Sequence, residues 1–304
     1  MTDLRAPIGI FDSGIGGLTV LDKIHSVLPY ENIIYIADSL HAPYGDNPPE
    51  FILSRSLRCA EFLADNKVKC LVIASNTATA CASLELRNRY PSLLIVATEP
   101  PVKPAIEAAD SKVIGVLVTA ATSSSGKYDR LLKRVSAAKK IITQPCPGLV
   151  KLIETQGPES DRTVELLTRY LMPLIDENID TLVLGCTHYP YLSEQIRRIV
   201  GADVTLIDPS LGVARHVRRR LEETKMLSDS HTKGAMQFWT SGSSDVFASA
   251  VARSQHAFGC SLSAYAACMP IILKESPEFN LVNPVLVGEP TQEDAPTQPE
   301  GLLL

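Results

Sequence analysis

The stretch Leu71-Val72-Ile73-Ala74-Ser75-Asn76-Thr77 has a close counterpart later in the chain, Leu182-Val183-Leu184-Gly185-Cys186-Thr187-His188. Each is a short apolar run, typical of a buried strand, that ends in small polar residues. The two stretches lie about one domain length apart, and open α/β sheets bind ligands at the carboxyl ends of their strands. The pattern favours two domains that face each other across a shared cleft. The alternative is that any α/β protein has several strands with small polar ends.

Apolar runs and amphipathic segments alternate along most of the chain. The runs predict strands at Ile8–Phe11, Ile33–Ala37, Cys70–Ala74, Leu93–Ala97, Val113–Val118, Lys140–Thr143, Thr181–Leu184 and Val204–Ile207. Segments between them, such as Glu50–Asn66, place apolar residues at near-helical spacing. Such alternation is typical of mostly parallel sheets covered by helices. We therefore predict an α/β protein with two domains of mostly parallel sheet flanked by helices, and an active site in the cleft between them.

Proline-containing turns at Glu99-Pro100-Pro101 and Asp208-Pro209-Ser210 suggest domain boundaries. A helix over residues 211–224 would then rejoin the first block. From about Ser276 the chain is proline-rich and polar, so it cannot bury enough apolar area to offset its ordering entropy. The expected parts are a first domain of residues 1–99 plus 211–268, a second domain of residues 100–210, and a flexible tail of residues 269–304.

The composition indicates neither a nucleic-acid-binding nor a membrane protein. The chain has 304 residues with 29 Lys and Arg against 34 Asp and Glu, a net charge of −5. Its one basic cluster, Arg215 with Arg218, Arg219 and Arg220, has the spacing of a solvated helix face. The chain has no apolar run long enough for a membrane helix and no signal-peptide core, which predicts a cytoplasmic location. Seven cysteines, an odd and scattered number, are expected to be free thiols.

The stretch Asp12-Ser13-Gly14-Ile15-Gly16-Gly17 follows the first expected strand and opens a helix. Glycines there let backbone N–H groups approach an anion at the helix N-terminus. The spacing departs from the G-x-G-x-x-G of dinucleotide-binding folds. A carboxylate-binding turn with Asp12 at its edge fits better. The alternative, a tight structural turn, would explain the glycines but explains Asp12 and Ser13 less well.

Two further loops carry candidate chemistry. Pro43-Tyr44-Gly45 combines a stiff residue, a hydroxyl group and a backbone amide open to close contact. Cys186-Thr187-His188 places an imidazole beside a thiol at a strand end, which is typical of an activated cysteine. A metal site is disfavoured, because no second ligand pair lies at a suitable spacing. The remaining alternative is that His188 is a structural histidine.

Taken together, these motifs resemble the cofactor-independent amino-acid racemases, most closely the glutamate racemases. The resemblance runs from about Ile8 to Pro209 and continues more weakly to Phe258. It implies two α/β domains with the active site between them, and a homodimer that uses no cofactor. It also implies interconversion of L- and D-glutamate, which supplies D-glutamate for peptidoglycan.

The resemblance further implies roles for individual residues. Position 75 and Cys186 are the two proton-transfer positions, assisted by Asp12 on one face and by His188 on the other. Glu154 stands where the family has an acid that can orient that histidine. The implied substrate contacts are Asp12, Ser13, Tyr44, Gly45, Asn76, Thr77, Thr187 and His188.

The chain departs from the family at Ser75, where the family has a catalytic cysteine. Racemisation needs a base on one face of the α-carbon and an acid on the other, and an alcohol is many units less acidic than a thiol. We therefore expect the chain to bind substrate but to turn it over poorly. Ser75 is either a deliberate substitution or a natural variant. The alternative functions are a substrate-binding protein without catalysis and a relative of the aspartate racemases, hydantoin racemases or maleate isomerases.

Overall fold

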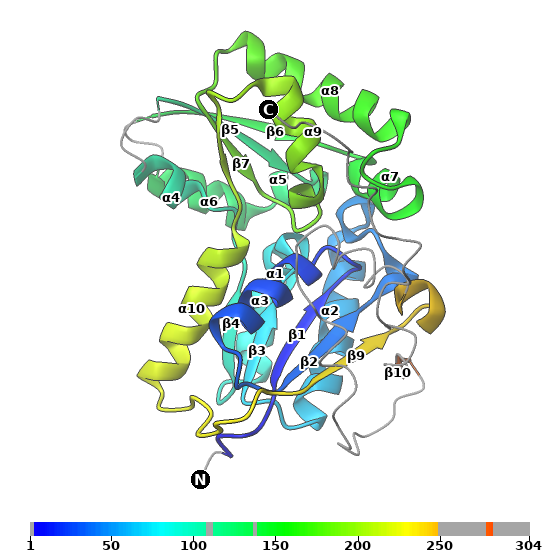
Figure 1. Cartoon of the computed structure of the whole chain (residues 1–304), viewed down its shortest axis with the longest axis vertical. Helices are drawn as coiled ribbons and strands as arrows, with labels where there is room; N and C mark the ends of the chain where they lie inside the picture. The colour runs from blue at the N-terminus through cyan, green and yellow to red at the C-terminus, as the bar shows by residue number, and fades with distance from the viewer. Residues whose placement is uncertain (1–2, 108–111, 136–138, 249–277, 282–304) are drawn as a thin grey trace, which may run out of the picture.

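The computed structural model describes residues 3–107, 112–135, 139–248 and 278–281. It contains two sheets, stacked along the long axis of the molecule with the smaller one at the top of Figure 1. The larger sheet has the strand order β10-β9-β2-β1-β3-β4, and the smaller has the order β6-β5-β7-β8. Every strand pairing is parallel except that of β10 with β9. The predicted α/β class with two domains of mostly parallel sheet is confirmed.

The larger sheet consists of β1 (Ile8–Asp12), β2 (Ile33–Ala37), β3 (Cys70–Ile73), β4 (Leu94–Ala97), β9 (Met236–Thr240) and β10 (Asn280–Leu281). Every residue of β1, β2 and β3 is buried, as expected for parallel strands with helices on both faces. These strands therefore read as continuous apolar runs in the sequence rather than as alternating ones.

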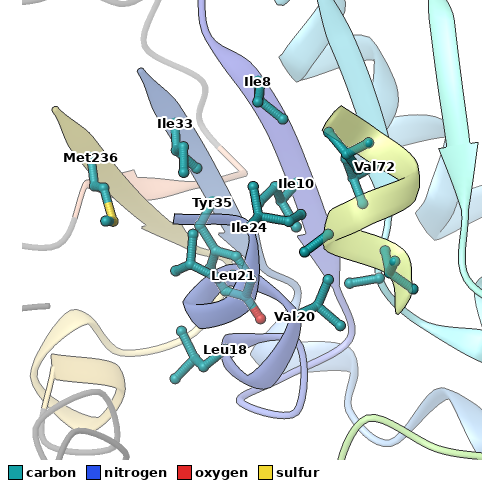
Figure 2. Close-up of a cluster of buried hydrophobic side chains, with 14 of the residues drawn as sticks. Ile8, Ile10, Leu18, Val20, Leu21, Ile24, Ile33, Tyr35, Val72 and Met236 are labelled. Atoms are coloured by element: carbon teal, nitrogen blue, oxygen red, sulfur yellow. The ribbon is translucent and has the colours of Figure 1, made fainter. Parts of the chain in front are cut away.

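Helices cover both faces of this sheet. On one face lie α1 (Leu18–Val27) and α10 (Ser210–Glu223), which pack against each other and share a core with β1. Figure 2 shows this core, which includes Leu21 and Ile24 of α1 and Ile10 and Val72 of the sheet. On the other face lie α2 (Pro49–Asp65) and α3 (Asn76–Arg89). The N-terminus of α3 follows β3 directly, so the polar residues after that strand begin a helix.

The smaller sheet consists of β5 (Val113–Val118), β6 (Lys140–Pro145), β7 (Thr181–Leu184) and β8 (Thr205–Ile207). One face packs against α7 (Leu149–Gln156), α8 (Asp161–Asp176) and α9 (Ser193–Val200). The other face packs against α4 (Val102–Glu107) and α6 (Gly126–Val135). The short helix α5 (Ala120–Ser123) and the 3-10 turns η1 (Ser39–His41), η2 (Tyr44–Asp46) and η3 (Tyr189–Leu192) complete the described elements.

All eight strands that the sequence predicts are present, and their ends differ by no more than two residues. The predicted helix over residues 211–224 is also present, as α10, and it returns the chain to the first sheet. The strand β9 was missed, although its sequence Met236-Gln-Phe-Trp-Thr240 is rich in strand-forming residues.

The prediction that residues 269–304 form a flexible tail is wrong for residues 278–281, the part of the tail that the structure describes. Asn280 and Leu281 pair with β9, and Phe279 is buried in the core that α2 covers. An aromatic side chain that fills a core offsets the ordering entropy that the polar composition led us to emphasise. The rest of the tail lies outside the described residues.

The basic cluster lies on α10, where Arg218 forms an ion pair with Glu222 at 2.8 Å and both side chains are about half exposed. This i,i+4 pair fits the solvated helix face expected from the sequence. Within the described ranges, none of the helices is both long and apolar enough to span a bilayer.

Candidate active site

The polar residues that follow β1, β3, β5 and β7 come together where the two domains meet. The hydroxyl group of Thr187, after β7, donates a hydrogen bond to Asp12 Oδ2 at 3.0 Å. Thr77 and Thr119, which follow β3 and β5, place their hydroxyl oxygens 2.9 Å apart. Because parallel strands end at the same edge of a sheet, two sheets that face each other at those edges collect these side chains in one region. This region is the candidate active site.

Asp12 is fully buried at the end of β1. Its Oδ1 accepts a hydrogen bond from the Ser13 N–H at 2.8 Å, and its Oδ2 accepts the one from Thr187. Burial raises the pKa of Asp12, against the opposing effect of the nearby His188. Ser13 is buried beside it. The carboxyl group therefore belongs to the site and is not a solvated loop residue.

Cys186, His188 and Glu154 form a chain of contacts. The Cys186 sulfur lies 3.8 Å from His188 Nδ1, and His188 Nε2 lies 2.7 Å from Glu154 Oε1. Burial lowers the pKa of His188, but its hydrogen bonds to Cys186 and Glu154 and the negative charge of those groups together outweigh burial, so the pKa lies well above its usual value. Burial raises the pKa of Glu154, but the hydrogen bond and charge of His188, together with the hydrogen bond from the Ile15 N–H, outweigh burial, so the pKa lies below its usual value. Both shifts favour an imidazolium–carboxylate pair directly beside the thiol.

The glycine turn of the first domain, residues 12–17, packs against Glu154 and His188 of the second domain. The Ile15 N–H donates to Glu154 Oε1 at 3.1 Å, and the Tyr191 hydroxyl donates to Ile15 O at 3.0 Å. A Cβ atom at Gly14 would collide with the Glu154 carboxylate, and one at Gly16 would collide with the His188 ring. The turn therefore requires glycine at these positions so that its backbone can approach side chains of the second domain. The anion that the Ile15 N–H of this turn binds is therefore the Glu154 carboxylate, a group of the protein itself.

Ser75 and Asn76 begin α3. Ser75 is buried, and its Oγ accepts a hydrogen bond from the Ala78 N–H at 3.2 Å, so the side chain is the N-cap of the helix. Asn76 is also buried, yet neither its Oδ1 nor its Nδ2 has a hydrogen-bond partner among the described residues. Buried amides in native proteins are nearly always satisfied. Asn76 is therefore suited to bind a polar group that the protein does not supply.

A group of hydroxyls joins the domains near Thr77. Thr119 is the N-cap of α5, and its Oγ1 lies 3.0 Å from Thr122 Oγ1 as well as 2.9 Å from Thr77 Oγ1. A Cβ atom at Gly45 would come within 2.8 Å of Thr119, so the Gly45 backbone lies against the same group. Thr119 and Thr122 are not among the site residues predicted from the sequence. The signal was available, because Thr119 follows an apolar strand as Ser75 and Cys186 do.

Tyr44 is buried, and its hydroxyl hydrogen is donated to a carboxylate of the protein. It donates to Asp38 Oδ2 at 2.5 Å, and Arg55 donates to both oxygens of the same carboxylate at 2.9 and 3.0 Å. Burial raises the pKa of Tyr44 well above its usual value, and the negative charge of Asp38 adds to this effect. The Pro43-Tyr44-Gly45 loop thus reaches the hydroxyl group at Thr119 through Gly45, while Tyr44 binds Asp38, the carboxylate that Arg55 of α2 also binds.

The arrangement can transfer protons on the side of Cys186. The Cys186 sulfur lies within hydrogen-bonding distance of the His188 imidazole, which can pass a proton to or from it. Within the part of the chain that the structure describes, no group of three or more His, Cys, Asp or Glu side chains is arranged to hold a metal ion. The five described cysteines are all free thiols, as predicted: Cys59, Cys70, Cys81, Cys146 and Cys186.

Known proteins share this architecture over most of the chain. The family model described as Asp/Glu/Hydantoin racemase matches residues 8–217. A glutamate racemase of Ectopseudomonas mendocina (strain ymp) is 47% identical over 242 residues, which cover 80% of this chain and 92% of that protein.

Two solved structures are similar at lower identity. A glutamate racemase isoform from Bacillus anthracis has a TM-score of 0.78 at 33% identity, covering 84% of this chain and 95% of that one. A glutamate racemase from Francisella tularensis in complex with D-glutamate has a TM-score of 0.74 at 30% identity, covering 85% of this chain and 95% of that one. The chain belongs to the Asp/Glu/Hydantoin racemase family.

Proposed function

We propose that this chain is a cofactor-independent glutamate racemase by descent and architecture, and that Ser75 leaves it with little or no turnover. The observation that carries the proposal is the chain of contacts from Cys186 through His188 to Glu154. The first-domain strand end at Ser75 has the matching sequence pattern. Relatives such as the Ectopseudomonas mendocina protein, at 47% identity, are glutamate racemases. A place in supplying D-glutamate for peptidoglycan follows from that family role.

The mechanism requires two groups on opposite faces of the α-carbon. On the second-domain face, the Cys186 thiolate removes the α-proton of L-glutamate, and His188 passes protons to and from the sulfur while Glu154 orients its ring. On the first-domain face, a thiol at position 75 would return a proton to the inverted carbon, with Asp12 assisting. The Ser75 alcohol is too weak an acid to do so efficiently, and an alkoxide base is essentially never populated.

Substrate binding is assigned to groups that remain intact. Asn76, Ser13 and Thr187 would bind the α-amino and α-carboxylate groups, as the unpartnered carboxamide of Asn76 suggests. The hydroxyls of Thr77 and Thr119, next to the Gly45 backbone, would bind the side-chain carboxylate.

The decisive experiment replaces Ser75 by cysteine. The Ser75→Cys form should interconvert L- and D-glutamate without added cofactor, at least about 10²-fold faster than the parent chain, because it regains a positioned proton-transfer group. Circular dichroism of a glutamate solution over time measures the conversion. A folded, glutamate-binding Ser75→Cys protein that stays inert would overturn the assignment, and faster racemisation of aspartate would move it to the neighbouring enzymes.

A second candidate function is favoured by Ser75 itself: a glutamate-binding protein that has lost catalysis. Both candidates predict that glutamate binds and raises the melting temperature by mass action. They differ in the activity that they predict for the Ser75→Cys form. A protein that had lost catalysis would also have accumulated changes at its other acid–base groups, so this single change would not restore turnover. Recovery of turnover by that single change supports the racemase.

We also propose that the chain acts in the cytoplasm as a homodimer, as the family resemblance implies. Sedimentation of the purified protein measures its mass in solution. A species of twice the chain mass is expected, and a monomer at micromolar concentration would contradict the proposal.

A further inference from the structure

The peptide group between Gly14 and Ile15 is held from both sides. Its carbonyl oxygen accepts a hydrogen bond from the Tyr35 hydroxyl at 2.8 Å, and its N–H donates to Glu154 Oε1 at 3.1 Å. A trans peptide group is planar, and its C=O and N–H bonds point in opposite directions. The bond from Tyr35 therefore fixes the direction in which the Ile15 N–H points toward Glu154.

Tyr35 is a residue of β2 whose side chain is fully buried. Figure 2 shows it among the apolar side chains of the core that α1 shares with the larger sheet. Burial raises the pKa of Tyr35 well above its usual value, and the negative charge of Asp12 adds to this effect. The hydroxyl therefore remains protonated and acts as a donor. The glycine turn lies against it, because a Cβ atom at Gly17 would come within 2.6 Å of the Tyr35 oxygen.

The next peptide group of the turn is held from the second domain. The hydroxyl of Tyr191, on η3, donates to Ile15 O at 3.0 Å. Ile15 thus has its N–H bound to a side chain of α7 and its C=O bound to a side chain of η3. Together with the bond from Tyr35, these contacts restrict the rotation of both peptide groups around Ile15.

The Glu154 carboxylate connects the turn to the imidazole beside Cys186. Its Oε1 accepts one hydrogen bond from the Ile15 N–H at 3.1 Å and another from His188 Nε2 at 2.7 Å. In a buried site of low dielectric constant, hydrogen bonds in a series polarise one another. A change in the direction or strength of the Ile15 bond therefore changes how the carboxylate holds the imidazole.

We propose that Tyr35 and Tyr191 are positioning residues for proton transfer. Their hydroxyls hold the peptide groups around Ile15, and the Ile15 N–H in turn orients the Glu154 carboxylate toward His188. Both tyrosines act through this turn and not on the substrate. The alternative is that the Tyr35 hydroxyl bonds to the turn only because a buried polar group needs a partner. That alternative predicts an effect on stability alone.

This inference rests on the proposed racemase function, and one of its tests does not need activity. In the parent chain, the His188 Nε2 proton donated to a carboxylate should give a downfield NMR resonance that exchanges slowly with water. Its absence from His188→Asn assigns it among the six histidines of the chain. Tyr35→Phe, which removes a single oxygen atom, should move this resonance and make its exchange with water faster.

The kinetic test uses the Ser75→Cys background. Tyr35→Phe and Tyr191→Phe should each lower kcat about three- to tenfold, the usual effect of one lost hydrogen bond. The KM for glutamate should stay nearly unchanged, because neither hydroxyl is assigned to the substrate. A purely structural role would lower the melting temperature and leave the kcat of the folded protein as it was. Tyr191→Phe also serves as the second variant, should Tyr35→Phe fail to fold.

Tyr128→Phe is the matched control. Tyr128 is buried in α6, and its hydroxyl lies 2.8 Å from Thr143 Oγ1 on β6. Its loss should lower the melting temperature and leave both the His188 resonance and kcat unchanged. A His188 resonance that moves equally in Tyr128→Phe would overturn the proposal.

Failure of the positioning role is distinguishable from failure of the proposed function. An unchanged His188 resonance in the folded tyrosine variants, or an unchanged kcat in an active background, would overturn the roles of Tyr35 and Tyr191. If the resonance moves while the Ser75→Cys protein is inert, the positioning of the imidazole stands and the racemase function fails.

Discussion

The strand ends after β3 and β7 have the same sequence pattern but different surroundings. After β7, the Cys186 sulfur lies 3.8 Å from an imidazole that is hydrogen-bonded to the Glu154 carboxylate. After β3, the Ser75 oxygen accepts a hydrogen bond from the Ala78 N–H and caps α3. No imidazole or amine is hydrogen-bonded to Ser75 within the described residues. One strand end is equipped to move a proton, and the other is equipped to begin a helix.

A cysteine at position 75 would have to do two things: cap the N-terminus of α3 and transfer a proton. Oxygen is a better acceptor for a helix N-terminus than sulfur, and sulfur is a far better acid and base near neutral pH. The serine therefore favours the stability of α3 over proton transfer. Such an exchange is a familiar form of the conflict between stability and activity at active sites.

The largest expected effect comes from removing Cys186, the thiol at the strand end that can move a proton. In the Ser75→Cys background, Cys186→Ala should lower the rate of racemisation by at least about 10²- to 10⁴-fold, because a positioned proton-transfer group is lost. Circular dichroism of glutamate solutions gives the rate. The change should leave glutamate binding nearly intact, which calorimetry checks. Racemisation that persists without Cys186 would show that the comparison of strand ends is wrong.

A smaller loss should follow from changing the imidazole beside the thiol. In the same background, His188→Asn keeps a polar side chain but removes the group that carries protons to and from the sulfur. We expect a decrease of about 10²-fold in kcat, the low end of the range for a proton-transfer group. The pH–rate profile should also lose the ionisation assigned to His188. An unchanged profile would make His188 a structural residue, the alternative that the sequence left open.

The predictions from sequence succeeded where a pattern is local and failed where it depends on tertiary contacts. Strand ends such as the one carrying Cys186 could be read from apolar runs that parallel sheets require. The contact between Glu154 and His188 fits a position that only the family resemblance had suggested. Thr119 was missed because its importance arises from its distance to Thr77, which no spacing along the chain reveals. The burial of Phe279 was missed because the composition around it is polar.

The Glu154–His188 pair should make stability depend on pH in a defined window. The raised pKa of His188 stabilises the fold below the usual histidine value of 6.5, and this contribution is lost as the pH rises through the raised value. The lowered pKa of Glu154 stabilises the fold above its usual 4.5, and this contribution is lost as the pH falls through the lowered value. The parent should therefore exceed Glu154→Gln in melting temperature most clearly between about pH 4.5 and 6.5.

Differential scanning calorimetry of both forms across that range measures the difference. Glu165→Gln is a matched control, because Glu165 and its partner Arg169 are exposed on α8. Its melting temperature should follow that of the parent at each pH. A Glu154→Gln difference that stays constant from pH 4 to pH 9 would contradict the proposed ion pair.

The smallest expected effect concerns the cap of α3. Ser75→Ala should lower the free energy of unfolding by about 1 kcal/mol, the usual value of an N-cap hydrogen bond. Ser75→Cys should lower it by a similar or smaller amount, because sulfur is a weak acceptor. Urea denaturation measures both. A Ser75→Cys protein more stable than the parent would contradict the view that oxygen at this position favours the helix.

The most direct test of the central claim uses the chain as it stands, with L- or D-glutamate in D₂O. If Cys186 retains the base of one face and Ser75 supplies no acid on the other, a removed α-proton returns from the same side. L-glutamate should then slowly gain α-deuterium while keeping its configuration, D-glutamate should exchange far less, and Cys186→Ala should abolish the exchange. NMR of the α-proton, followed by chiral analysis, measures all three. Faster exchange into D-glutamate, or exchange that does not depend on Cys186, would contradict the account.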